Sequence, residues 1–567
     1  MARSSKVKAM KKTKKLAALL AVLLCASIIV PMTACAYVDE DDGHEFTVLT
    51  VKEESVKDYN TMPVFRALAN ETGKDVYWTY NTSMQYSNNS NPVGIKGIDA
   101  IYHAGFSNLQ LYNYGRREKI VAIDEYIDKY MPNFKAILEK RPDIEEAIST
   151  TFPDGTKHIY SLPRVEEMGL KAYPNLLFIN KEWIKELIVA GDGSVTGLEE
   201  SDLADGLKLT RGQYKNILTA FKKKHSGCVP LAFVHDNWQG NESDFIASFG
   251  VPENVEHKTI VNDEVVFTVE DPNWFRAVKA MQEWYSAELI TSSAFTQTQD
   301  EFLARGQDGR YASFYWWEKD TVVSKDRRDD YIVLQPLVDD ETGKQYVGVS
   351  NELEIEKSEC VILSSCKDKA GLLSYFDKFF EPDYSAQLNY GSIDSGAFQK
   401  QKVDGKLIPN DDHGKQSADD FRMKNAPYGV VYLTQDEWAN SVEMESRAKL
   451  RLERLEAFVK PYNEYADYKS LSSQYEGAEL EEKLQGKTVI KSIPNLNYTK
   501  DELDALNRYE TMLGKNINSW MVNRIISGNT ITESDWQTNL IGANKTAMDN
   551  VKEVNKAAYK RYMEAIK

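Results

Sequence analysis

Apolar strand-like runs alternate with helix-like runs from Phe46 onward, and this order constrains the fold more than any single motif does. FTVLTV begins at Phe46, and a helical pattern follows over residues 63–70. Strand-like runs return at residues 75–80 (DVYWTY) and 97–105 (GIDAIYHAG). Strands separated by helices need crossover connections, which favour a parallel sheet. The pattern therefore predicts an α/β fold.

A second α/β unit is predicted from residue 175, where the apolar run NLLFI leads directly into NKEWIKEL. Asn180 is suited to cap this helix, because an Asn side chain accepts hydrogen bonds from the free amides of a first turn. Helical patterns follow at residues 211–224 and 274–289, and strand-like runs at 309–317 and 331–337. Beyond residue 368 we expect a largely helical part, with helices over residues 369–389, 435–459, 500–513 and 533–566.

The length of the chain indicates more than one core. A single hydrophobic core stops growing at about 250–300 residues, and this chain has 567 residues with only five cysteines. Cys360 and Cys366 lie in the strand-like ECVILSSC, where six extended residues would separate them by about 20 Å, beyond the ~7 Å that a disulfide can bridge. We expect at least two large lobes, with both thiols buried and unbridged.

The N-terminus has the form of an export signal. Basic residues without any acidic residue precede an apolar run from Leu16 to Val30, which is shorter than the ~20 residues of a spanning helix. Met32-Thr33-Ala34-Cys35 resembles a bacterial lipobox, in which the cysteine is lipidated and the chain is cut before it. We expect a signal peptide at residues 1–34 and a lipidated Cys35 with an acidic tether at 35–45. The alternative is an ordinary signal peptide that leaves Cys35 as a free thiol.

The charge of the chain argues against nucleic acid as a partner. The formal charge is −17, and it becomes −24 when the seven basic residues before Cys35 are removed. Such a field repels a polyanion. The sequence also lacks a Gly-x-Ser-x-Gly elbow, a His-Glu-x-x-His zinc motif and a phosphate-binding loop, and its seven histidines show no metal-ligand spacing. A glycoside hydrolase, which needs only a pair of carboxylates, stays open as an alternative.

Two adjacent tryptophans, Trp316 and Trp317, end a strand-like run and precede Glu318. Neighbouring side chains of a strand point to opposite faces, so both indoles cannot enter one core. We expect one of them to face a ligand cleft or solvent, since a flat aromatic face suits stacking on a sugar. The alternative is that both pack beneath loops.

Further candidate ligand residues follow other strand-like runs. Asp236, Asn237 and Trp238 lie in a polar loop after an apolar run, which is how an α/β sheet delivers side chains to a crevice at its strand ends. The remaining candidates are aromatic or polar residues near strand ends, each of which could instead be structural: Tyr80, Tyr102, His103, Arg164, Asn351 and Glu352.

The order of several motifs resembles that of extracellular solute-binding lipoproteins of bacterial ABC importers, in the carbohydrate-type family 1. The motifs are IDEYIDKYMPN at residues 123–133, PDG at 153–155, IYSLPR at 159–164 and LFINKEW at 177–183. WYSAELI at 284–290, FF and NYG within 379–391, and ISG at 526–528 followed by Trp536 agree as well. Many relatives carry an acidic calcium-type loop after the helix at 211–224, but KKKHSGCVP stands there in this chain, so we carry over no metal.

The resemblance implies a two-lobed, periplasmic-binding-protein-like α/β fold with a ligand cleft between the lobes. Lobe 1 is expected at roughly residues 46–160 plus a segment near 295–365, and lobe 2 at roughly 161–294 plus much of 366–567. The implied function is to capture a carbohydrate and deliver it to the transmembrane permease of an ABC importer. Display or adhesion at the surface, and binding of a peptide or other polar metabolite, are the alternatives.

The same resemblance implies a monomer without a cofactor and without enzymatic activity. We expect it on the outer face of the bacterial cytoplasmic membrane, anchored there through the lipid on Cys35.

Overall fold

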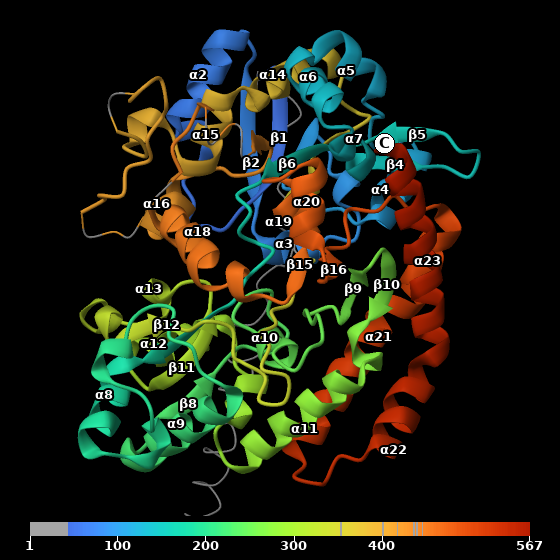
Figure 1. The fold of residues 1–567 in the computed structure, drawn as a ribbon. Coiled ribbons are helices and arrows are strands. Elements are labelled where there is room, and N and C mark those ends of the chain that lie inside the picture. Colours follow the sequence, from blue (N-terminus) through green and yellow to red (C-terminus); the bar gives the residue numbers. More distant parts are fainter. Residues whose placement is uncertain are drawn as a thin grey trace, which may run out of the picture.

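The computed structural model describes residues 44–351, 354–399, 402–414, 416, 418–434, 437, 440–444 and 446–566. The predicted signal peptide and Cys35 lie outside these residues, as does Glu352. The described chain forms two lobes, which lie one above the other in Figure 1. Among the described residues, no helix combines the length and the hydropathy that crossing a membrane requires.

The upper lobe is built on a six-stranded mixed sheet in the order β14-β6-β13-β3-β1-β2. β2 and β3 pair in parallel with β1, and β13 runs antiparallel between β3 and β6. The strands are β1 (Phe46–Val51), β2 (Val76–Asn81), β3 (Ala100–Tyr102), β6 (Leu162–Glu166), β13 (Ile355–Ile362) and β14 (Val431–Leu433). A hairpin of β4 (Ser149–Thr151) and β5 (Lys157–Ile159) lies beside it.

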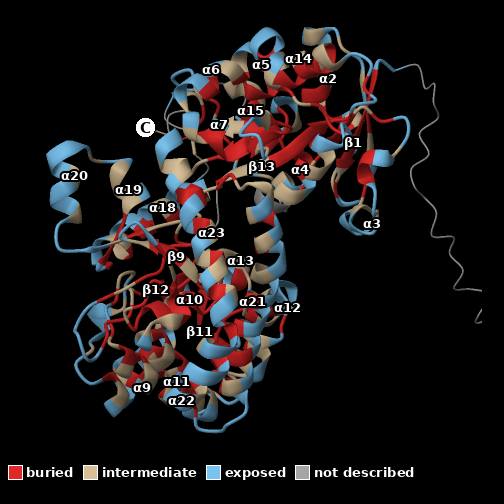
Figure 2. Ribbon diagram, turned by 90° about the vertical axis from the view of Figure 1, so that its right-hand side faces the viewer, coloured by how far each residue is buried: buried red, intermediate tan, exposed pale blue. Residues whose placement is uncertain are grey.

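Helices cover both faces of this sheet, and for that reason its strands are apolar on both sides. Val48 and Leu49 are adjacent in β1 and enter different core clusters. The helices of this lobe are α2 (Pro63–Thr72), α3 (Ser83–Ser87), α4 (Asn108–Arg116), α5 (Asp124–Tyr130), α6 (Pro132–Lys140), α7 (Pro142–Ile148), α14 (Lys369–Asp377), α15 (Pro382–Tyr390) and α16 (Ala418–Asn425). Figure 2 shows buried residues concentrated along the sheet between them.

The lower lobe is built on a four-stranded sheet in the order β12-β7-β11-β8. Its strands are β7 (Leu176–Asn180), β8 (Val229–Ala232), β11 (Tyr311–Trp316) and β12 (Tyr331–Val333). Alternate residues of β7 enter two clusters, one on each face of the sheet. The helices here are α8 (Lys181–Ala190), α9 (Arg211–Lys224), α10 (Ser243–Ala247), α11 (Pro272–Ser286), α12 (Gln299–Gln307), α13 (Lys319–Val322) and α18 (Ser446–Phe458).

A third, smaller sheet lies between the lobes, in the order β10-β9-β16-β15. Its strands are β9 (Lys258–Val261), β10 (Glu264–Phe267), β15 (Tyr465–Asp467) and β16 (Thr488–Lys491). The connection between β15 and β16 contains α19 (Tyr468–Ser472) and α20 (Gly477–Leu484). α20 has no buried residue and projects from the molecule in Figure 2.

A long C-terminal helical hairpin runs along both lobes, on the right-hand side of Figure 1. α21 (Lys500–Ile526) contacts α4 of the upper lobe and α11 of the lower lobe, and α23 (Ala543–Ala565) contacts α7 and β10. Between them lie α22 (Glu533–Asp535) and a π-helical turn (Trp536–Gly542). The hairpin therefore bridges the two lobes on one side.

Most of the predicted elements are confirmed. The strands at residues 75–80, 97–105 and 175–179 correspond to β2, β3 and β7, and the helix predicted at 211–224 is α9. Asn180 caps α8 as expected, since its side chain accepts a hydrogen bond from the amide of Trp183 at 3.0 Å. Cys360 and Cys366 are buried and unbridged.

The expected lobe boundaries differ from the sheet pairings in two places. Residues 295–365 were expected in lobe 1, but β11 and β12 pair with β7 in the lower lobe. Residues after 366 were expected mainly in lobe 2, but Leu372 and Phe376 of α14 pack in the upper core. Both differences have one cause: hydrogen-bonded strand partners far apart in sequence leave no local signal of their pairing.

Replacing Trp536 should uncouple the helical hairpin from the lower lobe. Trp536 is 1% exposed, its indole stacks on Phe275 with ring centroids 5.0 Å apart, and its Nε1 donates to the carbonyl of Val269 at 3.0 Å. We expect Trp536→Ala to lower the free energy of unfolding by about 3–5 kcal/mol in denaturant titrations. The control is Met512→Ala in α21, where the side chain is 59% exposed, and it should change the free energy of unfolding by less than about 0.5 kcal/mol. Equal losses in both variants would contradict the proposed role of Trp536.

Candidate functional site

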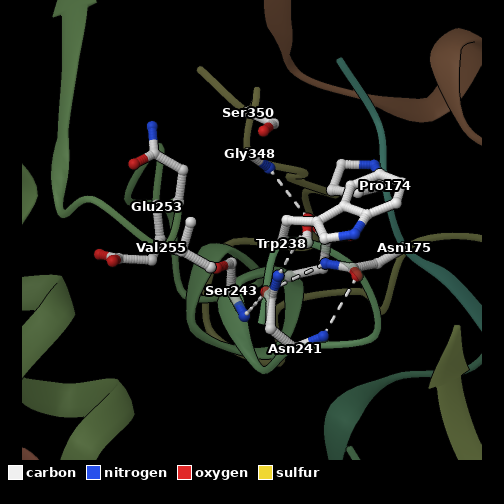
Figure 3. A pocket seen from close by; sticks show the side chains of 11 residues that line it. Pro174, Asn175, Trp238, Asn241, Ser243, Glu253, Val255, Gly348 and Ser350 are labelled. Atoms are coloured by element: carbon white, nitrogen blue, oxygen red, sulfur yellow. Dashed lines mark hydrogen bonds between the residues drawn. The ribbon is translucent and has the colours of Figure 1, made fainter. Parts of the chain in front are cut away.

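A small, partly open pocket of about 10 Å³ lies at one edge of the lower sheet, where chain segments enter and leave the strands. Crevices at strand ends are the usual ligand positions of α/β sheets. Four segments form its walls (Figure 3): the residues before β7, the loop after β8 with α10, the residues after α10, and residues 348–350, which precede β13 of the upper lobe. They contribute Pro174, Asn175, Trp238, Asn241, Ser243, Asp244, Glu253, Asn254, Val255, Gly348 and Ser350.

A buried Asn pair fixes the loop that carries Trp238. Asn175 Oδ1 accepts from the amide of Gly240 at 2.7 Å, and Asn175 Nδ2 donates to Asn241 Oδ1 at 3.2 Å. Asn241 Nδ2 in turn donates to the carbonyl of Asn237 at 2.8 Å. Gly240 has a φ of +68°, and a Cβ there would lie 2.1 Å from the Trp316 ring, so only glycine fits this turn. The loop is therefore held from both sides.

Asp244 is one of the two acidic residues that line the pocket, together with Glu253. It lies at the start of α10, where its Oδ1 accepts from the amide of Gly348 at 3.3 Å. Burial raises the pKa of Asp244 to about 7. A carboxyl group with such a pKa can donate or accept a hydrogen bond near neutral pH.

An aromatic pair stands beside these polar groups. The rings of Trp238 and Trp317 have centroids 5.4 Å apart and are inclined at 59°, and both side chains are half-buried. Trp316 points the other way: it is 2% exposed, its ring stacks on Phe302 at 4.7 Å, and its Nε1 donates to Thr321 at 2.9 Å. Trp317 is half-buried and packs against the core cluster that contains Trp316, so that its contact with a ligand cleft stays a prediction.

The corresponding edge of the upper sheet carries a network of paired charges. Glu166 accepts from Arg164 at 2.6 Å and from Arg422 at 3.0 Å, and Glu356 lies 3.4 Å from both Arg164 and Lys171. Burial would raise the pKa of Glu166, but Arg422 and Arg164 outweigh it and lower this pKa to about 2. The carboxylate therefore stays ionised at any physiological pH.

Two residues at this edge hold unusual backbone conformations. His103 has a φ of +58° and Tyr428 has a φ of +54°, and residues other than glycine rarely adopt such positive values. One ring nitrogen of His103 lies 2.7 Å from the carbonyl of Pro427 and the other 3.0 Å from Glu359. The Tyr428 ring lies 5.6 Å from the guanidinium of Arg164 and 5.1 Å from that of Arg422. Such strain concentrates at functional sites.

The structure places some predicted ligand residues at the two edges. Trp238 lines the pocket, and the Trp317 ring contacts the Trp238 ring. Arg164 and His103 belong to the charged network at the upper edge. Tyr80 is 44% exposed at the end of β2, beneath the ammonium of Lys52 at 3.9 Å. Contact of any of these residues with a ligand stays a prediction.

Other predicted ligand residues have structural roles instead. Trp316 is a core residue, and Glu318 is 1% exposed and paired with Arg454. Tyr102 is fully buried because alternate β3 residues face the core, and its hydroxyl donates to the Tyr428 carbonyl at 2.5 Å. Asn351 joins two segments, donating to the carbonyl of Lys258 at 2.8 Å and accepting from Ile493 at 2.9 Å.

Asp236 and Asn237 also turn away from the pocket. Asp236 accepts from Asn518 of α21 at 3.1 Å, and Asn237 donates to the carbonyl of Gln239 at 2.7 Å within its own turn. Asn241 and Asp244, a few residues further on, line the pocket in their place. Sequence reasoning missed these two and also Arg422 and Tyr428; a loop extended as far as the start of α10 would have included the first two.

The sequence was compared with characterised proteins. No protein-family model matches the chain. Over 498 residues it is 26% identical to FusA, the fructooligosaccharide ABC transporter substrate-binding protein of Streptococcus pneumoniae, covering 85% of this chain and 84% of FusA. Over most of its length the chain is therefore similar to a substrate-binding protein of an ABC transporter.

Solved structures of two solute-binding proteins have the same fold as this chain. The FusA complex with kestose superposes with a TM-score of 0.74 at 23% identity, over 92% of this chain and 99% of that one. A human-milk-oligosaccharide (HMO)-binding solute-binding protein of Bifidobacterium longum infantis gives a TM-score of 0.69 at 17% identity, over 91% and 98%. The expected periplasmic-binding-protein-like α/β fold is therefore confirmed.

Two buried histidine–glutamate pairs lie close to the pocket. His235 pairs with Glu242 across the Trp238 loop, and His257 pairs with the pocket residue Glu253 at 2.5 Å. Burial would lower the pKa of His235, but Glu242 outweighs it and raises this pKa. Burial would likewise raise the pKa of Glu242, but His235 lowers it. Each partner therefore stabilises the charged form of the other.

The stability contributed by the His235–Glu242 pair should depend on pH. The raised histidine pKa means that its contribution is complete below the unfolded value of about 6.5 and is lost as pH rises through the folded value. The lowered glutamate pKa means that its contribution is complete above about 4.3 and is lost as pH falls through the folded value. The pair should therefore stabilise the protein most between these limits.

We expect the double variant His235→Gln, Glu242→Gln to lose more unfolding free energy relative to wild type at pH 6 than at pH 9. Denaturant titrations at both pH values measure the two differences. The control is His44→Gln, which removes the solvent-exposed pair of His44 with Asp75 at the surface. A difference from wild type that stays the same at both pH values would contradict the charged pair.

Proposed function

We propose that this protein captures an oligosaccharide between its lobes and delivers it to the transmembrane permease of an ABC importer. The observation that carries this proposal is that Trp238, which contacts Trp317, lines one pocket together with Asn241 and Asp244. Indole faces stack on the C–H faces of sugar rings, while amide and carboxyl groups meet hydroxyls. The pocket supplies both kinds of contact within one loop and its neighbours.

The charges of the upper edge favour an uncharged ligand. Arg164, Arg422 and Lys171 each have a glutamate partner, Glu166 or Glu356. An ion-paired guanidinium gains little from a ligand carboxylate, because the new contact replaces one that already exists. A neutral sugar can still bond to the remaining lone pairs and N–H groups of such a network. FusA is named for fructooligosaccharides and has a structure with kestose, so we propose this class as the first to test.

Ligand binding between two lobes also supplies the driving force for closure. A ligand shifts an open–closed equilibrium only by its difference in affinity for the two states. A sugar that stacks on the lower lobe and hydrogen-bonds to the upper network contacts both lobes only when they are closed. The closed state then presents a defined surface to the permease.

Removing either indole should weaken sugar binding without unfolding the protein. We expect Trp317→Ala and Trp238→Ala each to raise the Kd for kestose by about tenfold to a hundredfold, or about 1.4–2.7 kcal/mol. Isothermal titration calorimetry measures these changes. Trp183→Ala is the matched control, because Trp183 stacks on His225 on the α8–α9 side of the lobe, outside the pocket. If wild type binds no glycan of a broad panel, a peptide or another polar metabolite becomes the better candidate.

We further propose that the protein is a monomeric lipoprotein held at the outer face of the cytoplasmic membrane by a lipid on Cys35. The support is the basic and apolar leader and the Met32-Thr33-Ala34-Cys35 sequence. Tethering raises the effective concentration of the binding protein at its permease.

Replacing Cys35 should release the protein. We expect Cys35→Ser to abolish incorporation of a labelled fatty acid and to move the protein from the membrane fraction to the medium. Cys228→Ser, within the folded lower lobe, is the control and should leave both unchanged. Fatty-acid labelling of the Cys35→Ser variant would contradict the proposed attachment site.

A further inference from the structure

Arg451 of α18 is a fully buried arginine that contacts Trp317, one member of the aromatic pair. Its side chain is 0% exposed, and its guanidinium carbon lies 3.7 Å from the centroid of the Trp317 ring. The same guanidinium donates to two backbone carbonyls, those of Trp317 and Tyr173. Trp317 therefore contacts both Arg451 and Trp238.

The setting of Arg451 differs from that of Arg454, one turn further along α18. Arg454 pairs with Glu318 and lies 3.6 Å from Asp205. Carboxylate partners of this kind are usual for buried arginines. In the part of the chain that the structure describes, no carboxylate lies within 4.0 Å of Arg451. Its charge is compensated by carbonyl oxygens and an indole face, and burial lowers its pKa.

Tyr173 connects this contact to the movement of the lobes. It lies in the segment that leaves β6 of the upper lobe and enters β7 of the lower lobe, directly before the pocket residues Pro174 and Asn175. Tyr173 is 2% exposed, so its carbonyl has a fixed position. One guanidinium thus bonds both to the end of β11, which carries Trp317, and to a chain segment that crosses between the lobes.

We propose that Arg451 is a positioning residue for ligand binding: it sets the orientation of the Trp317 indole and couples that orientation to the crossing segment at Tyr173. This inference rests on the proposed function, because it assumes that a ligand stacks on Trp317. The planar guanidinium is the group that suits this task, since it can stack on a ring while its N–H groups donate in the plane to two carbonyls. An ammonium group at the same position keeps the charge but cannot satisfy this geometry.

The test compares Arg451→Lys with Arg454→Lys, the same change at a buried arginine of the same helix that does not touch Trp317. The first measurement needs no ligand: circular dichroism of the full chain records the exciton signal of the two neighbouring indoles. The contribution of the Trp238–Trp317 pair is the difference between wild type and Trp317→Phe. The second measurement is the Kd for kestose, by calorimetry.

We expect Arg451→Lys to lose more than half of the exciton difference signal and to weaken kestose binding about tenfold. Arg454→Lys should keep both within about twofold, even if its thermal stability falls. In a Trp317→Phe background, Arg451→Lys should have less than a twofold further effect on affinity, because it acts through that ring. If Arg451→Lys does not fold, Arg451→Met, which replaces the buried charge by an apolar chain of similar length, is measured in its place.

Two outcomes would overturn the inference: an unchanged exciton signal in the folded Arg451 variant, or equal losses of signal and affinity in the Arg451 and Arg454 variants. Failure of the proposed function is distinguishable, since wild type would then not bind kestose while the ligand-free exciton signal would still respond to Arg451→Lys.

Discussion

Glu354 holds together the place where the chain crosses between the lobes. Its carboxylate accepts hydrogen bonds from the backbone amides of Met168, Gly169 and Leu170, each at 3.2 Å, and its own carbonyl accepts from the amide of Glu166. Glu354 is 8% exposed, and this burial raises the pKa of its carboxyl group. A crossing segment leaves one sheet before it joins the next, so its amides need partners that no strand supplies. One side chain provides three of them, and the two crossing segments are joined at that point.

The recognition surfaces of both lobes depend on this crossing. The segment starts at Glu166, which holds Arg164 and Arg422 at the upper edge, and ends at Asn175, which fixes the Trp238 loop at the lower edge. Between them, the carbonyl of Tyr173 accepts from Arg451. A change in the course of this one segment therefore changes the charged network, the aromatic pair and their separation together. One segment of this kind is what the proposed function needs, because both lobes would have to contact the same ligand.

Local patterns in the sequence predicted local structure well. The apolar run NLLFI and the capping Asn180 predicted β7 and α8, and strand alternation predicted that Trp316 and Trp317 would face different environments. Long-range pairing was not predictable in this way. Nothing near residue 311 indicates that β11 pairs with β7, and nothing near Arg451 indicates an indole more than a hundred residues earlier in the chain. Some polar residues were wrongly predicted to line the pocket for a related reason. The side chain of an Asn or Asp in a turn can hydrogen-bond to the nearby backbone as readily as to a ligand.

The distribution of charge suits the uncharged ligand that we propose. With a formal charge of −17, the chain cannot use its overall field to attract a neutral sugar. It instead pairs its charges at the upper edge, where Arg422 and Arg164 keep Glu166 ionised, and compensates Arg451 with carbonyls and an indole in the lower lobe. Paired charges remain strong hydrogen-bonding groups in fixed positions, and each already has an opposite charge beside it. Selectivity then depends on where the donors, acceptors and ring faces are held, and that is set by the crossing segments.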